Sequence, residues 1–280
     1  MNPVAHFSND NGVAIQYTMN HPLAGLFGSR NEHEVMFRRI STYLINNGHV
    51  QGNILDLGAW IGDNALPWSV SLLMAQHGQQ VSADTALDPN FVVYAIDPSP
   101  ENCRFMIDNS ALNGIENVVV IQRAISDKGE VLSTNEDLTH CTFVSDDSSS
   151  TNDSSTTYKN QIEAVSLDDL FFAGELTKIA YIHLDVEGME NRVIAGATSL
   201  IELCRPIIAF EQHLEQDPFL ELSAHIAEKG YTVYLINEVL PGCRPDCRNF
   251  IAFPNDSFDD TIANIINGHL GQDVLERVLL

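Results

Sequence analysis

Residues 52–62 read Gly-Asn-Ile-Leu-Asp-Leu-Gly-Ala-Trp-Ile-Gly, a short apolar run followed by a turn with two glycines. The run Asn53–Leu57 is typical of a buried strand, and a helical pattern begins at Asp63. Gly58 and Gly62 can adopt positive φ and let the backbone approach a ligand closely. The N–H groups at the start of the next helix favour a negatively charged ligand group. The stretch therefore predicts a nucleotide-binding turn between a strand and a helix.

The spacing of the two glycines separates this turn from a dinucleotide site. Gly58 and Gly62 form Gly-x-x-x-Gly, whereas a dinucleotide pyrophosphate is received by Gly-x-Gly-x-x-Gly. Asp56 stands two positions before Gly58, where its carboxylate would oppose a pyrophosphate but suits the ammonium of a methionine moiety. NAD-dependent oxidoreduction is the rival function, but the sequence lacks the glycines that would bind the pyrophosphate of NAD.

From residue 52 onward, short apolar runs alternate with helical patterns. The predicted strands are Asn53–Leu57, Phe91–Ile96, Val118–Gln122, Ile179–Leu184, Pro206–Phe210, Thr232–Ile236 and Asn249–Phe253. The predicted helices between them are Asp63–His77, Pro100–Asn113, Glu190–Leu203 and Pro218–Lys229. This alternation predicts an α/β fold, Rossmann-like, whose mostly parallel seven-stranded sheet has helices on both faces. Right-handed crossovers then bring the carboxyl ends of the parallel strands to one edge.

The chain is expected to have three parts. Residues 1–50 form an N-terminal extension, with a strand-like run at Val13–Met19 and a helix at Asn31–Ile45, which packs on the main domain. Residues 51–255 form the main domain, and residues 256–280 form a helical tail. Two segments interrupt the alternation: Gly78–Asn90 is a polar insertion, and Ser145–Thr157 is an acidic low-complexity stretch expected to be a mobile surface loop.

The next strands add residues to the predicted nucleotide site. Asp97 ends the second strand, where an acidic side chain can accept hydrogen bonds from both ribose hydroxyls, although it could also only cap a helix. Ala124 and Ile125 follow the third strand and could flank an adenine ring, or pack in the core. The fourth strand delivers His183, Asp185 and Glu187 to the same edge, on one face while the chain stays extended.

Six motifs together resemble the FkbM-type methyltransferases, a branch of the class I S-adenosylmethionine-dependent fold. They are Asp56-Leu-Gly-Ala-Trp-Ile-Gly-Asp63, Ala95-Ile-Asp97-Pro, Ala124-Ile-Ser-Asp127, Val165-Ser-Leu-Asp-Asp169, His183-Leu-Asp185-Val-Glu187-Gly188-Met-Glu190 and Ile208-Ala-Phe-Glu211. The resemblance covers roughly residues 50–255, and Trp60 departs from it, because the family more often carries a small or polar residue there.

The resemblance implies O-methylation of a sugar hydroxyl or of another small natural-product hydroxyl, with S-adenosylmethionine as the methyl donor. The residues expected to bind that cofactor are Asp56, Gly58, Trp60, Gly62, Asp97, Ala124, Ile125 and Asp185. A non-catalytic S-adenosylmethionine-binding module and a methyltransferase acting on a protein side chain are the alternatives.

Methylation of an alcohol requires that the hydroxyl lose its proton. A general base can remove the proton, or a bound divalent cation can lower the pKa of the hydroxyl. His213 is our first choice for the general base, since its ordinary pKa is near neutral. Asp185 and Glu211 are expected to orient the acceptor. A Mg²⁺ ion held by these two carboxylates and Glu187 is a second choice, because carboxylates at a strand edge also serve as hydrogen-bond acceptors; we predict no resident metal. Asp185 could instead stabilise the next helix, and His183 could be a buried structural group.

Composition limits the partners. The net charge is −24 with only 14 Lys and Arg, which argues against a nucleic-acid partner. Such charge serves solubility or a salty habitat, or else attracts cations or basic substrates. No run approaches eighteen apolar residues, and the first residues do not resemble a signal peptide, so we expect no membrane partner and a cytoplasmic protein. Five scattered cysteines do not form a disulfide framework, and Cys243 and Cys247 are expected to be free thiols in a turn.

Overall fold

The structure is a computed structural model of the 280-residue chain. It describes residues 4–8, 13–19, 34–78, 91–134, 144–145, 159–215, 217, 220–238 and 245–280. Residues 79–90 and 146–157, which make up nearly all of the two predicted interruptions, lie outside the described residues.

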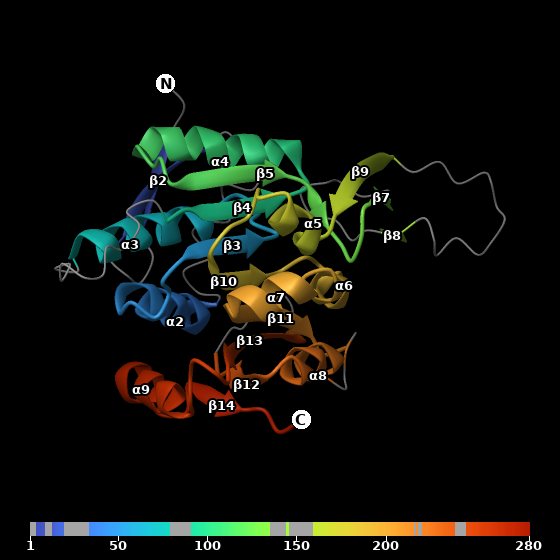
Figure 1. Cartoon of the computed structure of the whole chain (residues 1–280). Helices are drawn as coiled ribbons and strands as arrows, with labels where there is room; N and C mark the ends of the chain where they lie inside the picture. The colour runs from blue at the N-terminus through green and yellow to red at the C-terminus, as the bar shows by residue number, and fades with distance from the viewer. Residues whose placement is uncertain are drawn as a thin grey trace.

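The largest sheet has eight strands in the order β14-β12-β13-β11-β10-β3-β4-β5 (Figure 1). In chain order the strands are β3 (Asn53–Leu57), β4 (Val93–Asp97), β5 (Val118–Gln122), β10 (Ile179–Leu184), β11 (Ile207–His213), β12 (Tyr231–Ile236), β13 (Cys247–Pro254) and β14 (Leu275–Arg277). The five strands from β11 to β5 are parallel to one another, whereas β13 is antiparallel to both β11 and β12, and β14 is antiparallel to β12. The carboxyl ends of the parallel strands therefore meet at one edge.

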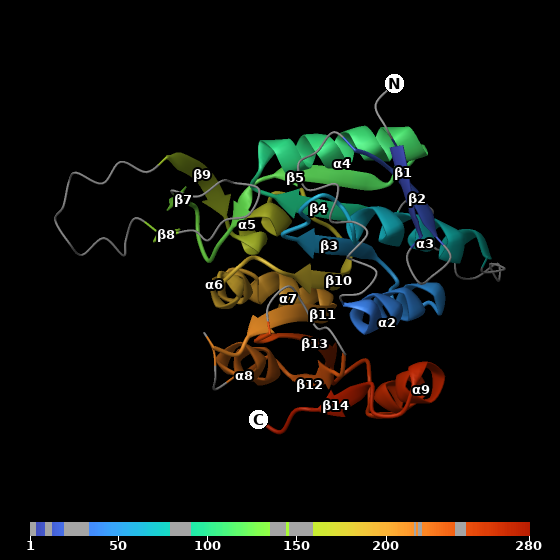
Figure 2. The same cartoon turned by 180° about the vertical axis from the view of Figure 1, so that it is seen from behind.

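Helices cover both faces of this sheet, as Figures 1 and 2 show from opposite sides. The helices are α2 (Val35–Asn46), α3 (Ala65–Gly78), α4 (Pro100–Asn113), α5 (Leu167–Phe172), α6 (Glu190–Ala195), α7 (Thr198–Cys204), α8 (Glu221–Glu228) and α9 (Thr261–Leu270). Side chains of α5 to α8 share one buried apolar cluster with the sheet, and those of α2, α3 and α9 share the other. Such coverage explains why the central strands read as continuous apolar runs.

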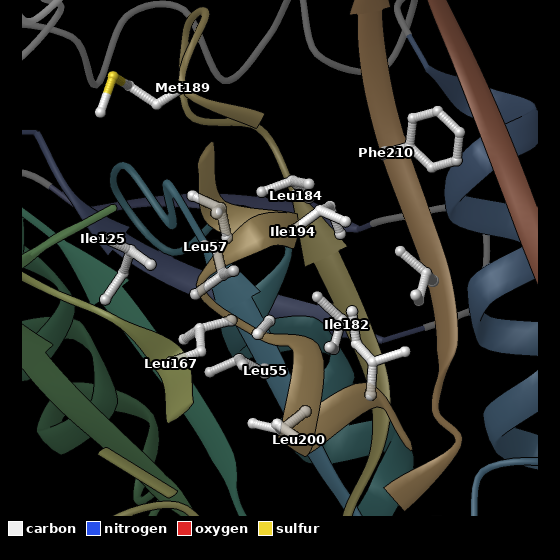
Figure 3. Close-up of a cluster of buried hydrophobic side chains, with 14 of the residues drawn as sticks. Leu55, Leu57, Ile125, Leu167, Ile182, Leu184, Met189, Ile194, Leu200 and Phe210 are labelled. Atoms are coloured by element: carbon white, nitrogen blue, oxygen red, sulfur yellow. The ribbon is translucent and has the colours of Figure 1, made fainter. Parts of the chain in front are cut away.

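Strand alternation decides which residues face each layer. Leu55 and Leu57 of β3 pack with Ile182 and Leu184 of β10 in the cluster beneath α5 to α8 (Figure 3). Ile54 and the residues in register with it belong to the opposite layer. Because side chains alternate along a strand, Asp56 points into the layer beneath α2 and α3.

The predicted strands and helices are largely confirmed, with two differences. The sheet has an eighth strand, β14, within the segment expected to be a helical tail; α9 supplies the helix of that segment. The helix predicted over Glu190–Leu203 is two helices, α6 and α7, separated at Gly196. A Cβ on Gly196 would lie 2.4 Å from the Ser126 carbonyl oxygen, so the chain passes another backbone closely where the helix breaks.

A second, four-stranded sheet lies between β5 and α5 in the chain and was not predicted. Its order is β6-β9-β7-β8, formed by β6 (Ala124–Ile125), β7 (Glu130–Thr134), β8 (Val144–Ser145) and β9 (Asn160–Val165). At the N-terminus, β1 (Val4–Ser8) and β2 (Ala14–Thr18) form an antiparallel hairpin. Helix α2 starts at Val35, and residues 31–33 of its predicted range lie outside the described residues. Within the part of the chain that the structure describes, every helix is too short or too polar to cross a membrane.

Candidate functional site

The glycine turn after β3 is built from positive-φ residues. Gly58, Trp60 and Gly62 have φ values of +77°, +46° and +79°. The N–H groups of Gly58 and Ala59 both donate to the carbonyl oxygen of Ile96, which ties the turn to β4. A Cβ on Gly58 would lie 1.7 Å from the backbone oxygen of Asp185, so only glycine fits between β3 and β10 at this point.

Asp97 holds the same turn from the end of β4. Its Oδ2 accepts a hydrogen bond from the Trp60 N–H at 2.9 Å, and its Oδ1 accepts from the Ser99 N–H and the Asn102 side chain. Burial raises the pKa of Asp97 to about 7, although these hydrogen bonds oppose the increase. The carboxylate thus joins the glycine turn to the start of α4, where Ser99 is the N-cap.

Asp56 and His183 form a buried pair on adjacent strands. Asp56 Oδ1 lies 2.7 Å from His183 Nδ1, and the two residues are in register between β3 and β10. Burial alone would lower the pKa of His183, but the hydrogen bond and charge of Asp56, together with the charges of Asp185 and Glu34, outweigh burial and raise the net pKa. The His183 ring stacks on Phe37 of α2 at 4.8 Å between centroids. Asp56 is only 1% exposed, so it lies beneath the turn rather than on its surface.

The turn after β10 begins at Asp185 and is held by Glu190. Glu187 and Gly188 have positive φ values of +53° and +99°. Glu190 Oε1 accepts hydrogen bonds from the N–H groups of Val186 and Gly188 at 3.2 and 3.1 Å. The first residue of α6 thereby fixes the loop that carries Asp185, which explains the spacing of the acidic residues in this motif.

Asp185 lies among other carboxylates. Burial is the largest cause that raises its pKa well above the ordinary value, and Glu211 and Glu187 raise it further. His183 opposes the increase. An aspartate in such surroundings binds a proton more readily than an exposed one does.

His213 is surrounded by groups that can accept or donate protons. Its Nε2 lies 3.5 Å from Glu211 and 3.9 Å from Glu187. Its Nδ1 lies 3.3 Å from the Cys247 thiol and 3.6 Å from Asp246. The structure thus brings together Asp185, Glu211 and His213, the three residues expected to act on the acceptor.

Trp60 and the pair Ala124 and Ile125 pack against apolar clusters. The Trp60 side chain is partly buried against a cluster that includes Ile15 and Tyr17 of the N-terminal hairpin. Ala124 and Ile125 form β6 and are 4% and 5% exposed within the core cluster. Their surroundings favour core packing.

Three residues near the site were not singled out as site residues from the sequence. Cys247, expected to lie in a turn, is instead the buried first residue of β13, in register with His213. Its predicted companion Cys243 lies outside the described residues.

Glu238 accepts hydrogen bonds from the Met36 N–H at the start of α2 and from Asn249. Glu34, just before α2, is also buried and acts electrostatically on Asp185 and His183. Only the folded structure reveals these partners, because they come from distant segments of the chain.

The sheet order, the antiparallel strand β13 between β11 and β12, and the glycine turn after central strand β3 define a class I methyltransferase fold. Within that class the chain belongs to the FkbM methyltransferase family. The profile of the Methyltransferase FkbM domain matches residues 73–233, which is more than half of the chain. The matched range begins within α3 and ends within β12, so the glycine turn and β13 lie outside it.

Solved structures of methyltransferases are also similar to this chain. Methyltransferase FkbM from Methylobacillus flagellatus KT is 17% identical with a TM-score of 0.46, over 72% of this chain and 43% of that one. Precorrin-6y C5,15-methyltransferase from Geobacter metallireducens GS-15 is 12% identical with a TM-score of 0.41, covering 79% of this chain and 88% of that one. M. jannaschii TYW2, solved in complex with AdoMet, is 12% identical with a TM-score of 0.39, covering 90% and 85%. This chain therefore spans less than half of the FkbM protein's length, and no curated protein matches it.

Proposed function

We propose that this protein is an S-adenosylmethionine-dependent O-methyltransferase that acts on a hydroxyl of a sugar or other small metabolite. One observation carries the proposal: the turn of Gly58–Gly62 and the group formed by Asp185, Glu211 and His213 adjoin at one sheet edge. The net charge of −24 makes a nucleic-acid acceptor a poor match. Residues 51–255 would form the methyltransferase domain, with the N-terminal hairpin and α2 packed on it as an extension.

The residues at the turn fit a methionine-bearing nucleoside cofactor. Gly58 and Gly62 carry no Cβ at the turn. Asp97 accepts three hydrogen bonds, from Trp60, Ser99 and Asn102, which leaves about one lone pair of its carboxylate for a ribose hydroxyl. The cofactor would supply an activated methyl group, so the protein chiefly has to align the donor and the acceptor. Asp56 would not contact the cofactor, since its carboxylate is buried; it would instead orient the His183 side chain.

The acceptor proton would pass to Asp185. Its pKa is raised by burial and by Glu211, and its backbone directly abuts Gly58 of the cofactor turn. His213, our first choice from the sequence, already has charged groups or a thiol beside both ring nitrogens. We therefore propose that Glu211 and His213 orient the acceptor and that Asp185 is the base, a role that an elevated pKa suits.

Calorimetry tests the cofactor first. S-adenosylhomocysteine should bind the purified chain with one site, and NAD should not bind. If S-adenosylhomocysteine fails to bind while the chain is folded by circular dichroism, the proposal is wrong.

A methyl-transfer screen with labelled cofactor then tests the acceptor class, using sugars, nucleotide sugars and small hydroxylated metabolites. With an active acceptor, Asp185→Asn should lower kcat by about 100-fold or more, since general-base catalysis contributes about 10²–10⁴-fold. Asp108→Asn, at an exposed position in the middle of α4, is the matched control and should keep full activity. Cofactor binding without transfer to any small acceptor, together with labelling of a protein, would replace the small-molecule proposal with a protein side chain as acceptor.

A further inference from the structure

Three different metal-binding side chains converge beside the proposed acceptor site. Glu211, His213 and Cys247 each offer one donor atom, and these atoms all lie within 4.8 Å of one another. The residues are 5%, 6% and 0% exposed. Apolar packing does not explain why a carboxylate, an imidazole and a thiol lie together in a buried position. A shared ligand would explain it.

The strands hold these donors in place. His213 and Cys247 are directly opposite each other in the antiparallel pair of β11 and β13, and Glu211 lies two residues earlier on the same face of β11. Two donors thus come from one strand and the third from its neighbour. A site built on strands keeps its geometry better than one built on loops.

We propose that Glu211, His213 and Cys247 bind one Zn²⁺ ion. Zinc takes sulfur, nitrogen and oxygen ligands together, whereas Mg²⁺ and Ca²⁺ take oxygen ligands. Tetrahedral zinc places its ligand atoms roughly 3.5 Å apart. The observed separations include 3.5 Å between Glu211 and His213, and 3.3 Å between His213 and Cys247, although these two involve different ring nitrogens. Closure on one ion therefore needs the imidazole or a neighbouring side chain to rotate until one ring nitrogen faces both other donor atoms, which already lie within 4.8 Å of it.

Three protein ligands leave the fourth zinc position open, as in catalytic rather than structural zinc sites. Asp246 and Glu187 lie 3.6 and 3.9 Å from the His213 ring and add negative charge around the ion. Binding releases the Cys247 thiol proton to solvent, because the thiolate is the ligand. An acceptor hydroxyl on the open position would be more acidic, and its proton would pass to Asp185. That catalytic role rests on the proposed function, whereas the binding of zinc does not.

Metal binding can be measured on the full chain without cofactor or acceptor. After removal of metal with a chelator, the chain should bind one Zn²⁺ in competition with a chromogenic chelator. Co²⁺ in place of Zn²⁺ should give a near-ultraviolet thiolate-to-metal charge-transfer band. Cys247→Ser should abolish that band and weaken zinc binding by more than about 100-fold, since even outer partners of metal ligands change affinity by about 10–100-fold.

Cys204→Ser is the matched control, because Cys204 is a free cysteine at the end of helix α7 and is not one of the three proposed ligands. This variant should keep both the band and the affinity. A chain that binds no Zn²⁺, binds Mg²⁺ instead, or keeps the cobalt band in Cys247→Ser overturns the proposal. If Cys247→Ser does not fold, the cobalt spectrum of the unsubstituted chain decides: no thiolate band means no site. Zinc binding without methyl transfer would contradict only the proposed function.

Discussion

Gly58 is the residue at which the sheet and the glycine turn constrain each other most tightly. Its φ is positive, and the Asp185 backbone occupies the space that a side chain would need. The glycine spacing in the sequence indicated a ligand-binding turn. The structure adds that Gly58 also lets β3 and β10 come together.

Gly58→Ala should therefore lose more stability than positive φ alone explains. The φ effect costs about 1 kcal/mol, and the overlap with the Asp185 carbonyl adds to it by forcing the two strands apart. Urea denaturation should show a loss well above this figure. Gly114→Ala is the control, since Gly114 has φ +64° with nothing within 4 Å of an added Cβ, and it should lose only about 1 kcal/mol. Equal losses in the two variants would contradict the close approach of β10.

Among the other single residues, Asp56 differs most from its expected role. An acidic residue two positions before the glycine suggested contact with a ligand ammonium, but its carboxylate is buried against His183. The sequence contains both residues, yet only the parallel register of β3 and β10 shows that they meet.

At the level of elements, helix α2 depends on a distant carboxylate. Its first residues have no side-chain cap of their own, and Glu238, after β12, accepts the Met36 N–H in place of one. A negative charge near a helix N-terminus is favourable, whereas burial of that charge is not. Burial dominates and raises the pKa of Glu238 to about 7.

This elevated pKa predicts a pH-dependent stability. Because the folded pKa is above the unfolded one, the contribution of Glu238 is fully present below about pH 4.5 and is lost as the pH rises through about 7. The free energy of unfolding of the unsubstituted chain, relative to Glu238→Gln, should thus fall by about 2 kcal/mol between pH 5 and pH 8, allowing for partial exposure. Urea titrations at the two pH values measure it. Glu276→Gln, at an exposed position of β14, should show no such change, and a constant difference for Glu238→Gln would refute the prediction.

The sequence predicts elements well where a simple pattern governs them. The bounds of β3, β5, β10 and α4 agree with the predicted ranges, because short, mainly apolar runs mark the parallel strands and because Pro100 and Gly114 mark the ends of a helix. The second sheet was missed, since β7 and β9 are rich in polar residues, partly exposed and separated by a long segment. β14 was missed because three residues carry too little pattern to predict a strand.

The candidate site was predictable in part for a related reason. Residues that end successive parallel strands must converge, so Asp97, Asp185 and Glu211 could be grouped from the sequence. Cys247 and Glu238 come from the antiparallel part of the sheet, where the partner of a strand is fixed by register and not by strand order. Their placement required the structure.

For the molecule as a whole, the net charge of −24 lowers the stability of the folded state through electrostatic repulsion. Like charges repel more strongly in the folded state, and salt screens that repulsion. The melting temperature at pH 8 should therefore rise by several degrees between low and 0.5 M sodium chloride, as followed by circular dichroism. Near pH 4.5, which is the sequence pI, the same addition should have little effect. A melting temperature independent of salt at pH 8 would show that self-repulsion is negligible.

The pairing of β3 with β10 also has a consequence for how the chain is made. The hydrogen-bonded partners Asp56 and His183 are 127 residues apart, and the second sheet is synthesised between them. On the ribosome, β3, β4 and β5 emerge first, and the edge of β3 that pairs with β10 remains unpaired until β10 is synthesised. An unpaired apolar edge of this kind is a site for chaperone binding or aggregation. The speed of synthesis across the intervening segment would then govern the yield of folded protein.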